Sequence, residues 1–430
     1  RSLYDSYIRA IRWASDRITS KGIIGFVTNA GFLESNAASG VRKCLSDEFS
    51  SIYVLHLRGN QRTSGELSRK EGGKIFGGGS RAPIAITLLV KDGKNAGKGN
   101  IYFHDIGEYL SREEKLQSIL EFGDISGIAA AEAWRHLSPD VHGDWLGQRE
   151  DDFNTYLPIG DKKGNILTLF SKYSRGVESR RDAWCYNSSS KNIAENLERM
   201  VSTYNDEAVK FGIEYEGLSV KARDGFVQRF VTKDPKKISW TPNLLRDVES
   251  GKKHTFDDTA IIQSLYRPFS KTWLYNDKNF VWSRYHMPNF FPSSREENLA
   301  IVIHGPGEVL PFTALMTSVV PDVHLLHGSQ CFPLYVNEDA VQTSADQEEI
   351  GLFGSANASA NLHGRRRYAI TDEGLSYFRG FYSSDVMRED DVFYYVYGLF
   401  HSIDYRSRYS ENLRKELPRI PRVKKEDDFW

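Results

Sequence analysis

The sequence predicts an α/β domain, of which the chain carries only part, followed by a mixed α+β domain. Within residues 1–107, short apolar runs typical of buried strands alternate with segments of helical periodicity. Beyond residue 107, short strands, many aromatic residues and turn signals replace this alternation. A length of 430 residues fits two or three domains. We therefore predict domains at 1–107 and 108–430.

The first domain has five predicted elements. The chain opens in a helical pattern, and Gly22 is predicted to end that first helix. Three strands are few for a complete doubly wound sheet, so we expect the other half of the sheet to lie upstream, in a longer parent chain. The predicted helices cover residues 3–18 and 40–49, and the predicted strands cover 23–27, 52–57 and 84–90.

The second domain is less regular. Residues 108–135 are mostly amphipathic helix, and two further helices are predicted at 389–401 and 405–417. Pro418 stops the last of these. Residues 338–363 are acidic and then small and polar, which predicts a flexible surface loop.

Composition excludes several classes of protein. The three cysteines, Cys44, Cys185 and Cys331, form no CxxC pair, so neither a disulfide framework nor a cysteine zinc site is indicated, and a reducing cytoplasm fits. No apolar run is long enough for a membrane helix, so we expect no membrane partner. The net charge of −1 means that any preference for nucleic acid must be local.

The strongest local signal is the segment 58–81, called here the basic loop. It holds six Lys or Arg against two Glu, together with several glycines that let a backbone approach a ligand closely. A flexible cationic loop beside a sheet suits contacts with DNA phosphates, although a solvated surface loop has the same composition. Its cations are Arg58, Arg62, Arg69, Lys70, Lys74 and Arg81.

Two further basic clusters leave alternatives open. Arg180 and Arg181 precede Asp182, and this group either touches DNA or forms a buried Arg–Asp pair. Residues 221–253 carry nine Lys or Arg against four acids, around Lys236 and Lys237. That stretch is either a DNA-facing stripe or a solvated face.

Other patterns favour structural roles. The strand-like run 299–303 leads into a Gly-containing segment that superficially resembles a cofactor-binding turn, but a tight turn is the better interpretation. His324 and His327 have the spacing of metal ligands without a third ligand nearby. His142 and Asp144 either form an acid–base pair or organise a turn. We therefore predict no cofactor-binding or metal site in this chain.

A resemblance to known enzymes covers most of the chain. Residues 3–91 resemble the second half of a gamma-class adenine-N6 DNA methyltransferase, and the whole is similar to the C-terminal part of type ISP restriction–modification enzymes. The first resemblance is carried by LYDSYI at 3–8, GFVTNAGFL at 25–33, IYVL at 52–55 and IFG at 75–77 running into the strand at 82–90. The second is carried by LRGNQR at 57–62, SRAPI at 80–84, DVHGDW at 140–145, GV at 176–177, RDAW at 181–184, YRPF at 266–269 and the segment 394–401.

This resemblance implies that residues 1–107 are the C-terminal half of a Rossmann-like methyltransferase sheet and that 108–430 are a DNA target-recognition domain. The expected partners are double-stranded DNA and upstream domains of the same parent chain. The target adenine would be flipped out of the duplex. Phe76 would stack on the flipped base, unless it is a core residue, and Asn29 would line the same pocket.

Two motifs of the family are absent: the Asn-Pro-Pro-Tyr motif that holds the adenine amino group, and the Gly-rich turn that holds S-adenosylmethionine. We therefore expect S-adenosylmethionine to be the cofactor of the full-length parent, none to bind this fragment, and the fragment alone to be inactive. The alternatives are a non-catalytic interaction module of a large multidomain DNA-processing protein and, third, a methyltransferase acting on RNA or protein.

Overall fold

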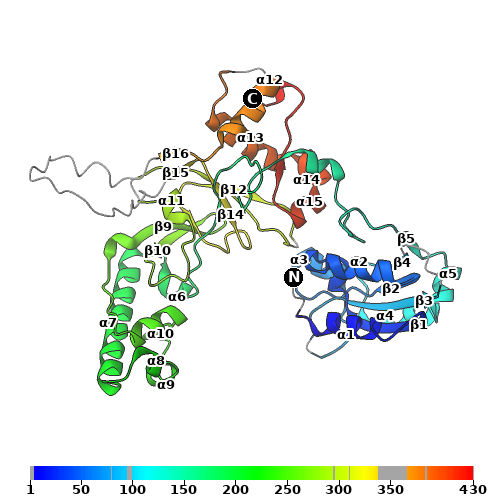
Figure 1. The fold of residues 1–430 in the computed structure, drawn as a ribbon, viewed down its shortest axis with the longest axis horizontal. Helices are drawn as coiled ribbons and strands as arrows, with labels where there is room; N and C mark the ends of the chain where they lie inside the picture. Colours follow the sequence, from blue (N-terminus) through cyan, green and yellow to red (C-terminus); the bar gives the residue numbers. More distant parts are fainter. Residues whose placement is uncertain are drawn as a thin grey trace, which may run out of the picture. The chain divides into compact units, whose positions relative to one another are not determined.

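The computed structural model describes residues 4–78, 80–93, 99–293, 296–308, 310–337, 366–382 and 385–429. The chain forms two compact units (Figure 1). The first unit comprises Arg1–Phe153 and Glu411–Glu416, and the second comprises Asn154–Ser410 and Leu417–Trp430. The predicted loop at 338–363 lies outside the described residues.

A five-stranded sheet forms the centre of the first unit, in the order β1-β3-β2-β4-β5. β3 pairs antiparallel with both β1 and β2, so β1 and β2 run parallel to each other, and β4 is parallel to β2. Mixed sheets of this kind are common in α/β folds. The strands are β1 (Lys21–Asn29), β2 (Ser51–His56), β3 (Ile84–Asp92), β4 (Asn100–Asp105) and β5 (Arg135–Leu137).

Helices cover both faces of this sheet. Ile11 of α1 and Leu45 of α2 join Ile52, Val54 and Leu89 in the core on one face. The C-terminal part of α4 and the helix α5 cover part of the other face. The helices of this unit are α1 (Ser6–Ser15), α2 (Ser39–Glu48), α3 (Gly65–Glu71), α4 (Arg112–Phe122) and α5 (Ile125–Ala130), with part of α15 (Ser410–Lys415).

The structure corrects two details of the predicted first domain. Gly22 does not end a helix: α1 stops at Ser15, and Gly22 lies in β1, where a Cβ atom would come within 3.0 Å of the Ile18 side chain. The sheet also continues past residue 107, because β5 pairs with β4. The predicted functional boundary at 107 stays a prediction, and the compact unit itself runs to Phe153.

The second unit contains two four-stranded sheets, β13-β9-β10-β8 and β12-β11-β14-β7. The first is built from β8 (Tyr186–Asn187), β9 (Ile261–Arg267), β10 (Ser270–Tyr275) and β13 (Val320–Pro321). The second is built from β7 (Ser174–Arg175), β11 (Ala300–Ile303), β12 (Ala314–Thr317) and β14 (Gln330–Pro333). Two short pairs complete the strands: β15 (Tyr335–Asn337) with β16 (Arg366–Tyr368), and β6 (Leu157–Pro158) with β17 (Arg419–Ile420).

A 25-residue helix, α7 (Ser190–Glu214), is the longest element of the second unit and was not predicted (Figure 1). Its buried side chains, from Ile193 to Phe211, share a core with α9 and α10. The short helices of this unit are α6 (Asp182–Cys185), α8 (Val220–Arg223), α9 (Val227–Phe230), α10 (Pro242–Glu249) and α11 (Met287–Phe290).

The C-terminal helices agree with the prediction in part. α13 (Glu389–His401) has the predicted bounds and follows α12 (Asp372–Tyr382). The helix predicted at 405–417 is interrupted at Tyr409, which separates α14 (Ile403–Arg408) from α15. The Tyr409 hydroxyl lies 2.9 Å from that of Tyr156, and both residues belong to the second unit, whereas Glu411–Glu416 belong to the first. Among the described residues, no helix combines the length and the apolar character needed to cross a membrane.

Candidate nucleic-acid interface

The carboxyl ends of three strands meet at one edge of the first sheet. β1 ends at Asn29, β2 leads into Arg58, and β4 ends at Asp105, whose carboxylate is paired with Arg58. β3 enters from the same edge, since Ile84 pairs with Asn29. In α/β sheets, ligands bind outside the carboxyl ends of parallel strands. The basic loop, which joins β2 to β3, therefore lies where a ligand is expected.

Over its described residues, 58–78 and 80–81, the basic loop contains a helix that the sequence analysis did not predict. It contains α3, and its two ends are joined by the Gln61 N–H, which donates to the Arg81 carbonyl at 2.9 Å. The Gly59 N–H donates to the Glu71 carbonyl at 3.1 Å. These bonds connect the start of the loop to its end and to the end of α3.

Two glycines of the loop approach other backbone instead of a ligand. A Cβ on Gly72, whose φ is +65°, would lie 2.1 Å from the Leu110 carbonyl oxygen, and one on Gly73 would lie 2.5 Å from the Arg112 nitrogen. The buried Lys115 ammonium donates to the carbonyls of Glu71 and Gly73 at 2.7 and 2.8 Å. Burial lowers the pKa of Lys115. These contacts seat the end of α3 on the segment before α4.

Arg58 is a structural residue. Its Nε lies 2.6 Å from an Asp105 oxygen, and its backbone takes a φ of +54°. Burial opposes ionisation of Asp105, but hydrogen bonds from His56, Arg58 and the Gly107 N–H outweigh it and lower the pKa of Asp105. Because this ion pair occupies the guanidinium, the predicted phosphate contact of Arg58 is not supported by its position.

The other cations of the basic loop differ in how free they are. Lys70 lies 3.7 Å from Glu108, and Arg69 lies 3.4 Å from Glu66 on an exposed surface. Arg81 donates from Nη2 to the Gln61 carbonyl at 2.6 Å. Arg62 and Lys74 take part in no ion pair within the described part of the chain. Exposed pairs such as Arg69–Glu66 are weak, so these groups can exchange partners for phosphate.

Phe76 and Asn29 both lie near this edge. Ile75 is buried, and its carbonyl accepts a hydrogen bond from Arg112 Nε at 2.9 Å, whereas the next side chain, Phe76, is 50% exposed. Phe76 is therefore not a core residue of this unit. The Asn29 side-chain oxygen accepts from the Gly31 N–H at 2.8 Å and caps the turn after β1.

The second unit presents a cluster of arginine and aromatic side chains. The exposed Arg180 lies 3.8 Å from the centre of the Trp282 ring and pairs with Glu178 at 2.7 Å. Arg175 donates to the Tyr285 hydroxyl at 3.2 Å. The sequence analysis missed Arg175, Trp282 and Tyr285, because the bridge between Glu178 and Ser283 that joins these segments connects residues far apart in the chain.

Arg181 fits neither of its two predicted roles. It is 4% exposed, and its three side-chain nitrogens have no hydrogen-bond partner among the described residues. Burial lowers its pKa. Asp182 is instead bound by Ser179 and by the Tyr266 hydroxyl, at 2.8 Å for the latter. Lys236 and Lys237 are exposed in the segment between α9 and α10, where they stay candidates for phosphate contact.

The turn predicted after the strand at 299–303 is present. β11 pairs with β12 and β14, and no described residue between β11 and β12 is helical. His327 lies 3.6 Å from Glu308 near this turn. Over the described residues, no group of three or more metal-binding side chains is found.

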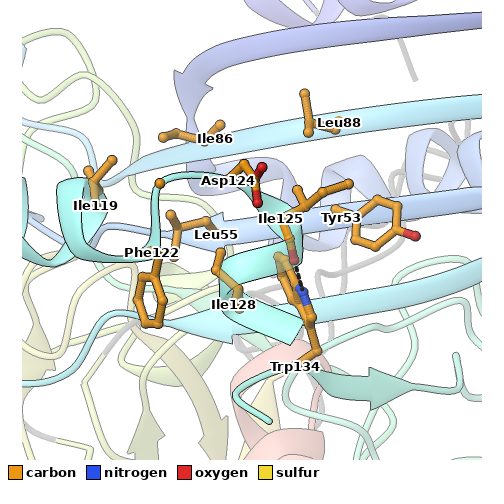
Figure 2. Close-up of a pocket in the computed structure, with 11 residues that line it drawn as sticks. Tyr53, Leu55, Ile86, Leu88, Ile119, Phe122, Asp124, Ile125, Ile128 and Trp134 are labelled. Atoms are coloured by element: carbon orange, nitrogen blue, oxygen red, sulfur yellow. Dashed lines mark hydrogen bonds between the residues drawn. The ribbon is translucent and has the colours of Figure 1, made fainter. Parts of the chain in front are cut away.

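An apolar pocket of about 230 Å³ lies on the face of the first sheet under α4 and α5 (Figure 2). Tyr53 and Leu55 of β2 and Leu88 of β3 line it, and the Trp134 indole closes one side by donating to the Ile125 carbonyl at 3.1 Å. Its one carboxylate, Asp124, caps α5 through the N–H groups of Ser126 and Gly127. None of the predicted site residues lines this pocket.

Comparison with known proteins gives the family. The model of the Type ISP C-terminal specificity domain matches residues 168–430. A nuclease-deletion mutant of the Type ISP restriction–modification enzyme LlaGI, solved with a DNA substrate mimic, is 36% identical over 99% of this chain, with a TM-score of 0.77. LlaBIII bound to DNA is 32% identical over 99%, with a TM-score of 0.79. A DrdV–DNA complex is 31% identical over 97%, with a TM-score of 0.77.

This chain spans 30%, 25% and 38%, respectively, of those three chains. A search of curated proteins found no match. The predicted resemblance is confirmed: the family model covers more than half of the chain, and the structural similarity extends over nearly all of it. The chain belongs to the Type ISP C-terminal specificity domain family of restriction–modification enzymes.

Proposed function

We propose that this chain recognises a DNA sequence and holds the duplex for adenine-N6 methylation within a type ISP enzyme. The observation that carries the proposal is the meeting of exposed cations and the exposed Phe76 at the carboxyl edge of the first sheet. The solved relatives named as DNA complexes support a DNA partner. Residues 1–107 would then be the C-terminal half of a Rossmann-like methyltransferase sheet, and the rest would supply target recognition.

The chemistry requires the adenine to leave the base stack, because its amino group cannot be reached inside a duplex. An exposed aromatic ring at the edge of the sheet offers a face on which an extruded base can stack. Phe76 has this position, held in place by the buried Ile75 beside it. Asn29 stands at the end of β1, beside the start of β3, and would lie beside the extruded base.

S-adenosylmethionine would supply the methyl group in the full-length parent. The pocket of Figure 2 does not suit this molecule, because its lining is apolar and its single carboxylate is used to cap α5. The ribose and amino-acid parts of the donor need free polar partners. We propose that the donor is held by other domains of the parent chain, and that this chain alone does not methylate DNA.

The DNA-binding proposal is tested by removing charge from the basic loop. Replacement of Arg62, Arg69 and Lys74 by alanine should weaken binding of a mixed-sequence duplex uniformly across sequences and reduce the slope of log affinity against log salt by up to about 3, since each lost phosphate contact releases fewer counterions. Fluorescence anisotropy at several salt concentrations measures both quantities.

The matched control replaces three exposed cations elsewhere in the first unit: Arg9, Lys21 and Lys43. It should leave the slope nearly unchanged. Equal slopes for the loop variant and the wild type would refute phosphate contacts by this loop. Salt-independent or absent binding by the wild type would favour the alternative, a non-catalytic interaction module.

The role of Phe76 is tested in the full-length parent. Phe76→Ala should slow adenine methylation about ten- to a hundredfold, because a base–aromatic stack contributes roughly 1–3 kcal/mol to holding the flipped base. Phe76→Trp should keep more activity, and duplex affinity should change less than turnover. An adenine mispaired at the target should partly rescue Phe76→Ala, since it is extruded more easily. Unchanged turnover for Phe76→Ala would exclude stacking.

A further inference from the structure

The turn between β9 and β10 carries an unusual residue. Arg267 pairs with Ser270, so Pro268 and Phe269 form a two-residue turn at the tip of a hairpin. Phe269 has a φ of +62°, and its side chain is 90% exposed, the highest value among the exposed large apolar residues of the described chain. A turn with proline at its second position and a positive φ at its third favours glycine at the third.

Folding alone does not explain phenylalanine at this position. A left-handed backbone is unfavourable for any residue with a Cβ, and exposing an aromatic ring to water adds a second unfavourable contribution. Strained residues of this kind cluster at functional sites. The ring makes no aromatic stacking or cation–π contact within the described chain, so no such contact holds it. The position therefore indicates an intermolecular contact.

Polar contacts hold the base of the hairpin. Arg267 donates to the buried Asp322 at 2.8 Å and lies 3.8 Å from the centre of the Tyr266 ring. The Tyr266 hydroxyl donates to Asp182, also at 2.8 Å, and Ser264 Oγ donates to the Val320 carbonyl at 2.7 Å. These four contacts hold the strands below the two-residue tip, so the backbone from which Phe269 projects is well supported.

The surroundings of the tip fit a polyanion. Phe269 borders an open groove of about 420 Å³, lined also by Leu265, Lys271 and the segment 315–318. Lys271 is exposed and takes part in no ion pair within the described residues, and no carboxylate lines the groove. This arrangement suits duplex DNA, because the Lys271 ammonium can contact a phosphate while the projecting Phe269 ring contacts the neighbouring base step.

We infer that Phe269 is an apolar wedge that contacts the bases of duplex DNA, with Lys271 on the adjoining phosphate. The inference rests on the proposed DNA-binding function, to which it adds a specific DNA contact made by the second unit. Apolar side chains inserted at base steps partly unstack them and bend the duplex. The wedge therefore favours base steps that unstack easily, and Phe269 contributes to sequence preference without hydrogen bonds to base edges.

The experiment first selects tight-binding sequences from a pool of random 40-base-pair duplexes with the 430-residue chain. Affinity for a selected duplex is then measured for Phe269→Gly, Phe269→Trp and Lys271→Ala. Phe269→Gly should bind about ten- to a hundredfold more weakly, with an unchanged salt slope and a melting temperature equal to or above that of the wild type. Phe269→Trp should bind more tightly than Phe269→Gly. Lys271→Ala should reduce the salt slope by about one.

A 2-aminopurine placed at successive positions of the duplex gives a second readout, because unstacking at the wedge raises its fluorescence in the wild-type complex only. Phe226→Ala, which removes a 43%-exposed aromatic from the same unit, is the matched control and should leave affinity unchanged. If the Phe269→Gly variant binds DNA with wild-type affinity, the inference about Phe269 is wrong, although the DNA-binding proposal stands. The ring would then contact another domain of the parent chain. A wild-type chain that binds no duplex would overturn both proposals.

Discussion

The carboxylate of Asp144 is 1% exposed and lies among three cations: 2.5 Å from Arg42, 2.9 Å from Lys415 and 3.1 Å from Arg149. Burial opposes its ionisation, but the hydrogen bond from Lys415 and the three positive charges outweigh that effect and lower the pKa of Asp144. The Asp144 N–H in turn donates to Asp140 at 2.8 Å. Asp140 organises this turn, because its carboxylate accepts from the N–H groups of His142 and Asp144, whereas the Asp144 carboxylate is the centre of a buried ion cluster.

Removing one cation from this cluster should destabilise the first unit. Lys415→Met leaves part of a buried negative charge uncompensated, and we expect its free energy of unfolding to fall by about 3 kcal/mol, the lower end for a broken buried pair because two cations remain. Lys43→Met is the control, since it removes an exposed partner of Asp47 and should change stability by less than about 1 kcal/mol. Urea unfolding measures both, and equal losses would contradict the argument.

Acid titration gives a second readout of the same cluster. A lowered pKa in the folded state means that Asp144 contributes stability above its unfolded pKa and that this contribution is lost as the pH falls through the folded value. Asp105, whose pKa is also lowered, acts in the same direction. Wild-type stability should therefore fall below about pH 4, and Asp144→Asn, although less stable at neutral pH, should show a flatter acid slope. Parallel slopes would exclude Asp144 from the acid transition.

At the scale of elements, α3 depends on glycine. Gly72→Ala would place a methyl group 2.1 Å from the Leu110 carbonyl oxygen at a positive φ, so α3 must move, at a cost of more than about 1 kcal/mol. We expect faster hydrogen exchange across Gly65–Glu71 and weaker DNA binding. Gly77→Ala is the control, because no atom lies within 4 Å of a Cβ there. Identical hydrogen exchange in the two variants would contradict the claim that the contact of Gly72 with Leu110 positions α3.

The same helix explains why some elements could be predicted and others could not. β2, β3 and α13 each bury several side chains, and β1 alternates exposed positions with partly or fully buried ones over most of its length; the predicted bounds of all four agree with the structure to within a few residues. α3 buries no residue, so its sequence carries no apolar period. Its position is set by Gly72 and by backbone bonds to Lys115, a residue over 40 positions away. α7 does carry a stripe of apolar residues at helical spacing, so matching its apolar positions to a 3.6-residue period would have predicted this helix.

At the scale of the whole molecule, the sequence names the cations of the candidate site, but it does not say which of them are already engaged in ion pairs. The basic loop is contiguous in sequence, so its cations could be named in advance. Whether each is available depended on distant partners: Asp105 occupies Arg58, and Glu108 lies near Lys70. In the second unit, Arg175 and Tyr285 are 110 residues apart and meet through strand pairing, which no local pattern reveals.

The return of Glu411–Glu416 to the first unit has a consequence for building hybrid enzymes. The chain passes from one unit to the other three times, so no single crossover point in the gene exchanges the second unit cleanly. A recombinant that takes everything after residue 153 from a donor enzyme inherits the donor's version of this segment. That segment must still provide an asparagine at 412 to bond both the N–H and the carbonyl of Glu150, and a lysine at 415 to meet Asp144. Exchanging the second unit to change the DNA target therefore needs three junctions, after residues 153, 410 and 416, so that the six residues Glu411–Glu416 stay those of the recipient.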